Sequence, residues 1–228
     1  MRHISRQALV HLSLAGAAAC VSSAVNAAAP IEACDAASFQ TVVHAAPAQY
    51  DARAVWLNAG LVKWPGAAAD GSFKLYHSPT AAISAAKGAK VSGAAGALTL
   101  AAFEGSVPSA ASVRFKYVAQ GPVLAVAKKD MAALPELHRQ QLVLVHEAAD
   151  GTVIAATRIQ SAGALDDLYA AAAKAVDLGA TAGKGRTSFK LWAPTARDVS
   201  VCTFDNGNAR ATSIEQMKRD AKTGVWST

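Results

Sequence analysis

Residues 188–205 read SFKLWAPTARDVSVCTFD, two strand-like runs separated by a short break at Ala-Pro-Thr-Ala. Phe189 and Leu191 alternate with polar residues before the break, and Val199 and Val201 do so after it. A period of two is typical of a strand with one apolar face. We therefore expect these four side chains to point into the core of a β-sandwich.

Trp192 lies at the end of the first run, next to the break. We interpret it as a structural aromatic residue that packs at the bend, near the place where a neighbouring domain docks. Asp-Asn-Gly at 205–207 predicts a hairpin turn after the second run. Residues 186–228 are thus predicted to contain the first strands of a sandwich.

Upstream of this stretch, further short apolar runs predict an antiparallel β-sandwich over residues 49–163. Two hairpins are expected, one around Asn-Ala-Gly at 58–60 and one around Asp150-Gly151. The runs expected to be strands include DARAVWLNAGLVKW (51–64), SFKLYHS (72–78), SVRFKYVA (112–119), VLAVA (123–127) and QLVLVHEAADGTVIAATRI (141–159).

A different periodicity follows in LDDLYAAAAKAV, residues 165–176, where apolar residues recur on one helical face. We predict a linking α-helix over residues 164–178, between two β domains. Residues 130–138 predict a single helical turn, because Pro135 interrupts a longer helix. The predicted fold class is therefore mostly β with one linking helix.

The N-terminus, residues 1–27, has the layout of a secretory signal peptide that ends at Ala27. Arg2 and Arg6 precede an apolar run, and small residues follow it. Export to the periplasm or the cell exterior is the expectation, with a lipid on Cys20 as the alternative that would bring in a membrane. Residues 28–48 are predicted to be a flexible linker.

The remaining two cysteines, Cys34 and Cys202, fall in different predicted segments. We interpret Cys202 as a small buried side chain in a strand and leave the disulfide state of the pair open. The net charge is +6, but no run of Lys and Arg interleaved with aromatic residues occurs. We expect no nucleic-acid partner.

Motifs of catalytic or metal-binding type are not found in the sequence. It has no HxxxH, CxxC, GxSxG or Asp-rich calcium loop. Its acidic residues fall in turns, caps and linkers, whereas glycoside hydrolysis needs two carboxylates held across the scissile bond. We expect no metal, no cofactor and no catalytic residue in this chain.

Aromatic side chains on β domains remain as candidate binding groups, since flat rings stack on the apolar faces of pyranose sugars. Trp64 and Tyr76 are the candidate substrate-binding residues. For Trp64, which precedes Pro65, core packing and exposure both stay open. Trp56, flanked by Val55 and Leu57, is interpreted as structural.

These segments resemble a known family. DARAVWLNAGLVKWP (51–65) and SFKLYHS resemble the second N-terminal β-sandwich domain of bacterial pullulanases, and LDDLYA (165–170) continues the pattern. FKLWAPTARDVSV (189–201) is similar to the opening of the immunoglobulin-like early-set domain, carbohydrate-binding module family 48, of debranching enzymes of glycoside hydrolase family 13.

The resemblance implies export, an α-glucan partner (pullulan, amylopectin or glycogen) and a C-terminal (β/α)₈ barrel that performs α-1,6-glucosidic hydrolysis. That barrel is missing from the chain, and the second sandwich is expected to be incomplete. The function expected is therefore a non-catalytic N-terminal portion that assists glucan binding or domain positioning. The alternatives are a stand-alone carbohydrate-binding protein and a structural spacer without sugar contact.

Overall fold

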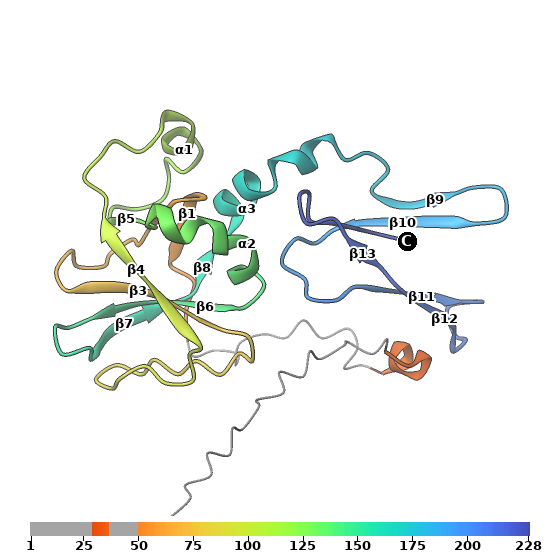
Figure 1. Cartoon of the computed structure of the whole chain (residues 1–228), viewed down its shortest axis with the longest axis horizontal. Coiled ribbons are helices and arrows are strands. Elements are labelled where there is room, and N and C mark those ends of the chain that lie inside the picture. Colours follow the sequence, from red (N-terminus) through yellow and green to blue (C-terminus); the bar gives the residue numbers. More distant parts are fainter. Residues whose placement is uncertain (1–28, 37–49) are drawn as a thin grey trace, which may run out of the picture.

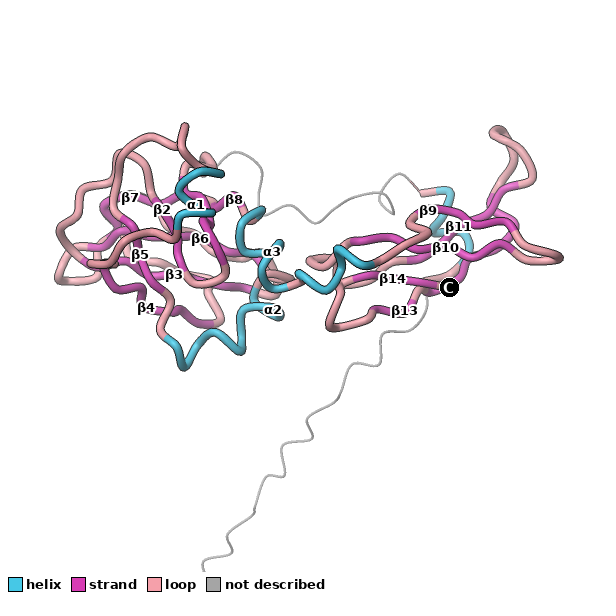
Figure 2. Tube along the Cα trace, turned by 90° about the horizontal axis from the view of Figure 1, so that it is seen from above, coloured by secondary structure: helices cyan, strands magenta, loops and turns pink. Residues whose placement is uncertain are grey.

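The computed structural model describes residues 29–36 and 50–228. The predicted signal peptide, its cleavage site at Ala27 and the alternative lipid site at Cys20 lie outside the described residues. Two β domains follow each other along the long axis of the described chain, and short helices lie between them (Figures 1 and 2). Within the described ranges, no helix combines the length and the apolar character needed to cross a membrane.

The first domain is one eight-stranded sheet in the order β7-β6-β3-β4-β5-β2-β1-β8. All neighbouring strands are antiparallel except β1 and β8, which are parallel. The strands are β1 (Ala54–Asn58), β2 (Leu61–Lys63), β3 (Ser72–Ser78), β4 (Gly96–Ala102), β5 (Val123–Ala125), β6 (Gln141–Glu147), β7 (Val153–Thr157) and β8 (Ile159–Gln160).

Strand β4 joins the two layers of this sheet. Its first part pairs with β3, where Leu98 lies opposite Leu75, and its end pairs with β5, where Ala102 lies opposite Leu124. The layers enclose one apolar core, which confirms the predicted sandwich. Buried side chains of this core include Trp56, Val62, Trp64, Phe73, Leu75, Leu124, Leu134 and Leu144.

Both predicted hairpins of the first domain are present, because β1 pairs with β2 and β6 pairs with β7. The strand predicted over residues 112–119 is wrong. That segment contains the end of helix α1 (Ser109–Arg114), which begins after Pro108. Pro108 has φ of −51° and its carbonyl accepts the Ser112 N–H at 2.9 Å, so the chain turns into a helix. The alternation of apolar and charged residues in this segment does not mark a buried face, since Tyr117 is 89% exposed.

The helices near the domain boundary differ in length from the prediction. Residues 128–137 form a 3₁₀ helix, η3 (Lys128–Ala133), and a short helix, α2 (Leu134–Leu137), with Pro135 in its first turn. The single helix expected over 164–178 is α3 (Ala162–Leu168) followed by η4 (Ala170–Lys174), with the break at Tyr169. In the first turn of α3, Gly163 packs directly on the backbone carbonyl of Trp56, where a Cβ would not fit.

The second domain contains a four-stranded sheet in the order β13-β14-β10-β9 and a separate two-stranded hairpin of β11 and β12. The predicted hairpin turn at 205–207 joins this pair. The strands are β9 (Gly179–Ala182), β10 (Thr187–Trp192), β11 (Ser200–Phe204), β12 (Ala211–Gln216), β13 (Lys218–Arg219) and β14 (Val225–Ser227).

The expectation that the apolar face of this second domain is buried is wrong for Leu191, which is 49% exposed. Phe189, Val199 and Val201 are only half-buried. The reason is that no buried apolar cluster of the described residues includes a residue of β10 or β11. Within the described residues, β10 therefore has a face that no second layer covers completely.

Cys34 and Cys202 form a disulfide bond, with their Cα atoms 6.0 Å apart. Cys34 is buried in a 3₁₀ helix, η1 (Ile31–Asp35), which lies beside β12, and the Asp35 carboxylate accepts the Ala211 N–H at 3.1 Å. The flexible linker predicted over 28–48 is therefore wrong at η1, and Cys202 is not a free buried thiol. The two cysteines are 168 positions apart, a separation at which local sequence carries no pairing signal.

Candidate functional site

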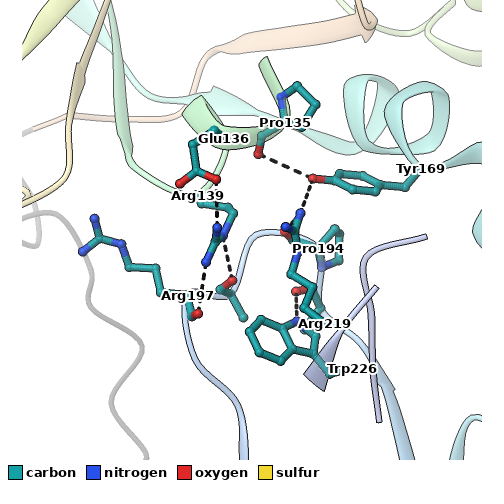
Figure 3. A network of polar contacts seen from close by, with 10 residues as sticks. Pro135, Glu136, Arg139, Tyr169, Pro194, Arg197, Arg219 and Trp226 are labelled. Atoms are coloured by element: carbon teal, nitrogen blue, oxygen red, sulfur yellow. Dashed lines mark hydrogen bonds and ion pairs between the residues drawn. The ribbon is translucent and has the colours of Figure 1, made fainter. Parts of the chain in front are cut away.

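The joint between the two domains, here called the domain joint, contains a network of polar side chains that no sequence motif indicates (Figure 3). The first domain contributes α2, α3 and η4. The second contributes the loop after β10, together with β13 and β14. Tyr169, at the break between α3 and η4, is 2% exposed and points into this joint.

Arg219 crosses the joint from the second domain. Its Nη2 donates to the Tyr169 hydroxyl at 2.9 Å and to the Pro194 carbonyl at 3.4 Å. The Tyr169 hydroxyl in turn donates to the Pro135 carbonyl at 3.5 Å, and the guanidinium carbon lies 5.9 Å from the centre of the Tyr169 ring. A hydrogen bond with one charged partner is stronger than a neutral one. Tyr169 therefore connects both domains through its hydroxyl and its ring.

Arg139 crosses the joint in the opposite direction. Its Nε donates to the Ala196 carbonyl at 3.1 Å, its Nη2 donates to the Arg197 carbonyl at 3.0 Å, and its Nη1 pairs with Glu136 at 2.8 Å. Glu136 orients the guanidinium from the first domain toward the loop of the second. Two arginines, one from each domain, thus fix the relative position of the domains.

An apolar cleft of about 430 Å³, here called the Trp192 cleft, opens beside this network. Trp192 is 36% exposed, and its Nε1 donates to the Thr223 carbonyl at 2.9 Å, which holds the indole in one orientation. The other lining residues are Asp166, Tyr169, Ala170, Ala172, Ala173 and Leu178. A concave apolar wall with one oriented ring and one carboxylate suits a sugar, whose ring stacks while its hydroxyls donate to the acid.

Trp64, a candidate for sugar binding, lies in the core instead. It is 1% exposed, and its ring meets that of Phe73 edge-on at 6.0 Å between centroids. A sugar cannot reach it, so the structure contradicts a binding role for Trp64. The cause is the β2–β5 pairing: the Trp64 N–H donates to the Pro122 carbonyl at 3.0 Å, which holds this position within the sheet. Trp56 is fully buried in the same core.

Tyr76, the other candidate, is half-buried on the outer face of β3. Its hydroxyl donates to Glu147 at 2.5 Å, and Lys74 Nζ lies 2.7 Å from the other carboxylate oxygen. The pKa of Tyr76 is raised mainly by burial and, to a smaller extent, by the hydrogen bond to Glu147. The hydrogen bond to Glu147 is also the main cause that raises the pKa of Lys74. The ring of Tyr76 also packs against the small apolar cluster around Ile83 and Val143. Both its ring and its hydroxyl therefore make contacts within the fold.

Sequence reasoning missed Tyr169 and Arg219 as joint residues. Tyr169 was expected only as one apolar residue on a helical face, and Arg219 stood out in no motif. Trp192 was expected to pack at the bend near a domain contact, and it does border the joint, but part of its ring is exposed. The described residues contain no group of three or more His, Cys, Asp or Glu side chains that could hold a metal.

Two closely joined β domains, the second bordered by an oriented and partly exposed indole, define a two-domain, mostly β protein. Residues 177–228 match carbohydrate-binding module 48, the isoamylase N-terminal domain, and residues 51–167 match the pullulanase N2 domain. The chain belongs to the pullulanase N2 domain family and is an N-terminal pullulanase region.

Two curated relatives agree with this assignment. The pullulanase of Klebsiella pneumoniae is 32% identical over 176 residues, which cover 77% of this chain and 16% of that protein. Pullulanase 1, chloroplastic, of Arabidopsis thaliana is 31% identical over 176 residues, 77% of this chain and 18% of that protein. The chain therefore spans less than a fifth of the length of these relatives.

Solved structures of pullulanases are also similar to this chain. Apo pullulanase from Klebsiella pneumoniae superposes with a TM-score of 0.65 at 30% identity, over 78% of this chain and 19% of that one. The maltotriose complex of PulA from the same organism gives a TM-score of 0.66 at 28% identity, over 78% and 18% of the two chains.

Proposed function

We propose that this chain is the non-catalytic N-terminal portion of a starch- and pullulan-debranching enzyme of glycoside hydrolase family 13. In this proposal a barrel domain of the same polypeptide hydrolyses the α-1,6-glucosidic bond. The present residues hold two domains in a fixed relative position and contribute a contact to the α-glucan. The relatives named pullulanase, and the maltotriose bound in one of the matched structures, support an α-glucan as the ligand.

The Trp192 cleft is the observation that carries the glucan contact. Its indole is oriented before any ligand arrives, because Nε1 is already hydrogen bonded to the Thr223 carbonyl. Pre-orientation lowers the entropy that binding has to offset. Among the aromatic residues considered from the sequence, Trp192 alone combines a held ring with exposure beside a cleft of sugar size.

The network of Arg139, Tyr169 and Arg219 carries the positioning role. It lies partly buried between the domains, where water competes weakly for the same donors and acceptors. A rigid pair of domains keeps the Trp192 cleft at a constant distance from whatever domain follows. A flexible connection would not.

Export to the periplasm or the cell exterior belongs to the same proposal. The Cys34–Cys202 bond supports it, because disulfides persist in oxidising compartments and are rare in the reducing cytosol. The basic, apolar and small-residue layout of residues 1–27 supports it independently.

Affinity electrophoresis of the chain through gels containing pullulan, amylopectin or glycogen tests the glucan contact. We expect retardation by at least one α-glucan. Trp192→Ala should weaken that retardation about tenfold, equivalent to about 1.4 kcal/mol. Phe204→Ala is the matched control, because Phe204 is an exposed aromatic residue on β11 that does not line the Trp192 cleft.

Each other result selects an alternative. No retardation by any of the three polymers would leave the structural spacer as the function. Equal weakening by both substitutions would remove the Trp192 cleft as the site. Release of reducing ends from pullulan by this chain would overturn the non-catalytic role. If the protein secreted by the native cells binds an α-glucan and contains no barrel domain, the stand-alone carbohydrate-binding protein is favoured.

A further inference from the structure

A second cleft at the domain joint, here called the joint crease, has a chemistry unlike that of the Trp192 cleft. It has a volume of about 290 Å³ and is walled by both domains. The first domain contributes polar side chains from the α2–β6 connection and from the β7–β8 turn, and the second contributes the loop after β10. The residues that matter are Arg139, Gln140, Gln141, Arg158, Thr195 and Arg197.

The charged side chains that line the joint crease are all arginines. Three arginines line it, and no aspartate or glutamate is among its lining residues. The Arg139 guanidinium is already engaged by Glu136 and two carbonyls. The Arg158 Nε donates to the Tyr50 carbonyl at 3.0 Å, which leaves both of its η nitrogens without a partner among the described residues. Arg197 has no side-chain partner within those same ranges.

The two glutamines add hydrogen-bond donors. The side-chain oxygen of Gln140 meets His77 Nδ1 at 2.9 Å, and that of Gln141 accepts the Ile83 N–H at 2.9 Å. With each of these oxygens already in one hydrogen bond, the group of each amide that has no partner among the described residues is its NH₂, which only donates. A neutral sugar needs acceptors as well as donors, whereas an anion needs donors alone. The crease therefore favours an anion.

We propose that the joint crease binds a phosphate group, either inorganic phosphate or the phosphate monoester of a sugar. Arg158 of the first domain and Arg197 of the second supply the guanidinium groups, which match phosphate oxygens in two-point contacts. The crease has about ten times the ~30 Å³ that one water molecule occupies in the liquid, so a sugar ring fits beside the phosphate.

The position of the crease gives the bound phosphate a structural effect. Because Arg158 and Arg197 belong to different domains, a ligand between them adds a contact across the domain joint. Phosphate therefore stiffens the joint. This role is independent of the neutral α-glucan contact at the Trp192 cleft.

Isothermal titration calorimetry at low ionic strength tests the proposal with three probes: inorganic phosphate, glucose 6-phosphate and glucose. Both phosphate compounds should bind, glucose should not, and added salt should weaken the binding. Arg158→Gln and Arg197→Gln should each weaken it at least fivefold. Arg186→Gln is the matched control, since Arg186 is exposed in the β9–β10 turn, outside the crease.

The two sources of phosphate are separated in the same experiment. Tighter binding of glucose 6-phosphate than of inorganic phosphate identifies a phosphorylated sugar, and equal binding identifies free phosphate. Arg197→Gln is the decisive variant, because its side chain holds no structural contact in the described ranges and its loss should leave the melting temperature unchanged. Equal weakening by all three substitutions, binding of glucose as tight as that of its phosphate, or no heat with any phosphate compound would overturn the proposal.

Discussion

Removing one oxygen atom from Tyr169 should uncouple the two domains. In Tyr169→Phe the buried ring stays, but Arg219 loses the hydroxyl that accepts its Nη2 at 2.9 Å, and the 3.5 Å contact with the Pro135 carbonyl is lost as well. Hydrogen bonds to charged groups contribute about 1.5–3 kcal/mol each. Of its hydrogen bonds Arg219 keeps only the longer one, to the Pro194 carbonyl at 3.4 Å, and its Nε is buried without a hydrogen-bond partner in the described structure. We therefore expect a loss of about 2 kcal/mol.

Scanning calorimetry and a double-mutant cycle measure this loss. The wild-type chain should unfold in one transition, because the joint couples its domains, and Tyr169→Phe should split that transition into two. A cycle of Tyr169→Phe with Arg219→Met should return a coupling energy of about 2 kcal/mol. Tyr50→Phe is the matched control: its hydroxyl accepts the Ala85 N–H at 2.6 Å inside the first domain, so its loss should leave the coupling unchanged.

The reasoning fails if the cycle is additive. An additive cycle would mean that the Tyr169 hydroxyl and Arg219 act independently, and a wild-type chain with two separate transitions would mean that the joint transmits no stability between the domains. Either result would also remove the positioning role proposed for this chain, while leaving the sugar contact at Trp192 open to its own test.

Two further predictions concern pH and redox state. Burial lowers the pKa of His138 to about 4, against 6.5 for the ordinary side chain, so the unfolded chain takes up a proton that the fold excludes. The stability from neutral His138 is complete above pH 6.5 and falls as the pH drops toward 4. The loss between pH 7 and pH 5 is about 2 kcal/mol in urea unfolding. His138→Phe, which keeps a ring against Trp56, should flatten this pH dependence of the free energy of unfolding. An equal loss of stability in the wild type and the variant between pH 7 and pH 5 would contradict the assignment to His138. Cys34→Ser should lower the free energy of unfolding by about 5 kcal/mol, the loop-closure entropy of the 168-residue separation. A reductant should destabilise the wild type and not the variant, and equal shifts in both would count against the bond.

The secondary structure of the first domain was largely predictable, because its signals are local. Asp150-Gly151 and the alternation in β3 each act within a few residues, and the structure has the expected hairpin and strand there. The segment around Tyr117 was misread for the same reason. Its alternation is short, and the Pro108 turn that starts α1 outweighs it.

The candidate site was less predictable, because its parts are distant in the sequence. Tyr169 and Arg219 are 50 positions apart and meet only when the domains pack. Trp64 directly follows β2 and Trp192 ends β10, and each comes shortly before a proline, yet Trp64 is buried and Trp192 borders a cleft. No local sequence pattern distinguishes the two tryptophans, since the burial of each depends on which strand packs beside it in the folded protein.

The sequence by itself determined the class of fold and the predicted hairpin turns, because periodicity and turn chemistry depend on neighbouring residues, and its motifs carried the resemblance to the family. Only the tertiary structure decided the Cys34–Cys202 bond, the arginine contacts across the domain joint and the burial of each tryptophan. These features depend on distances between atoms from separate parts of the chain. Packing brings such atoms within a few ångströms, and at that range hydrogen bonds, charge and the exclusion of water act.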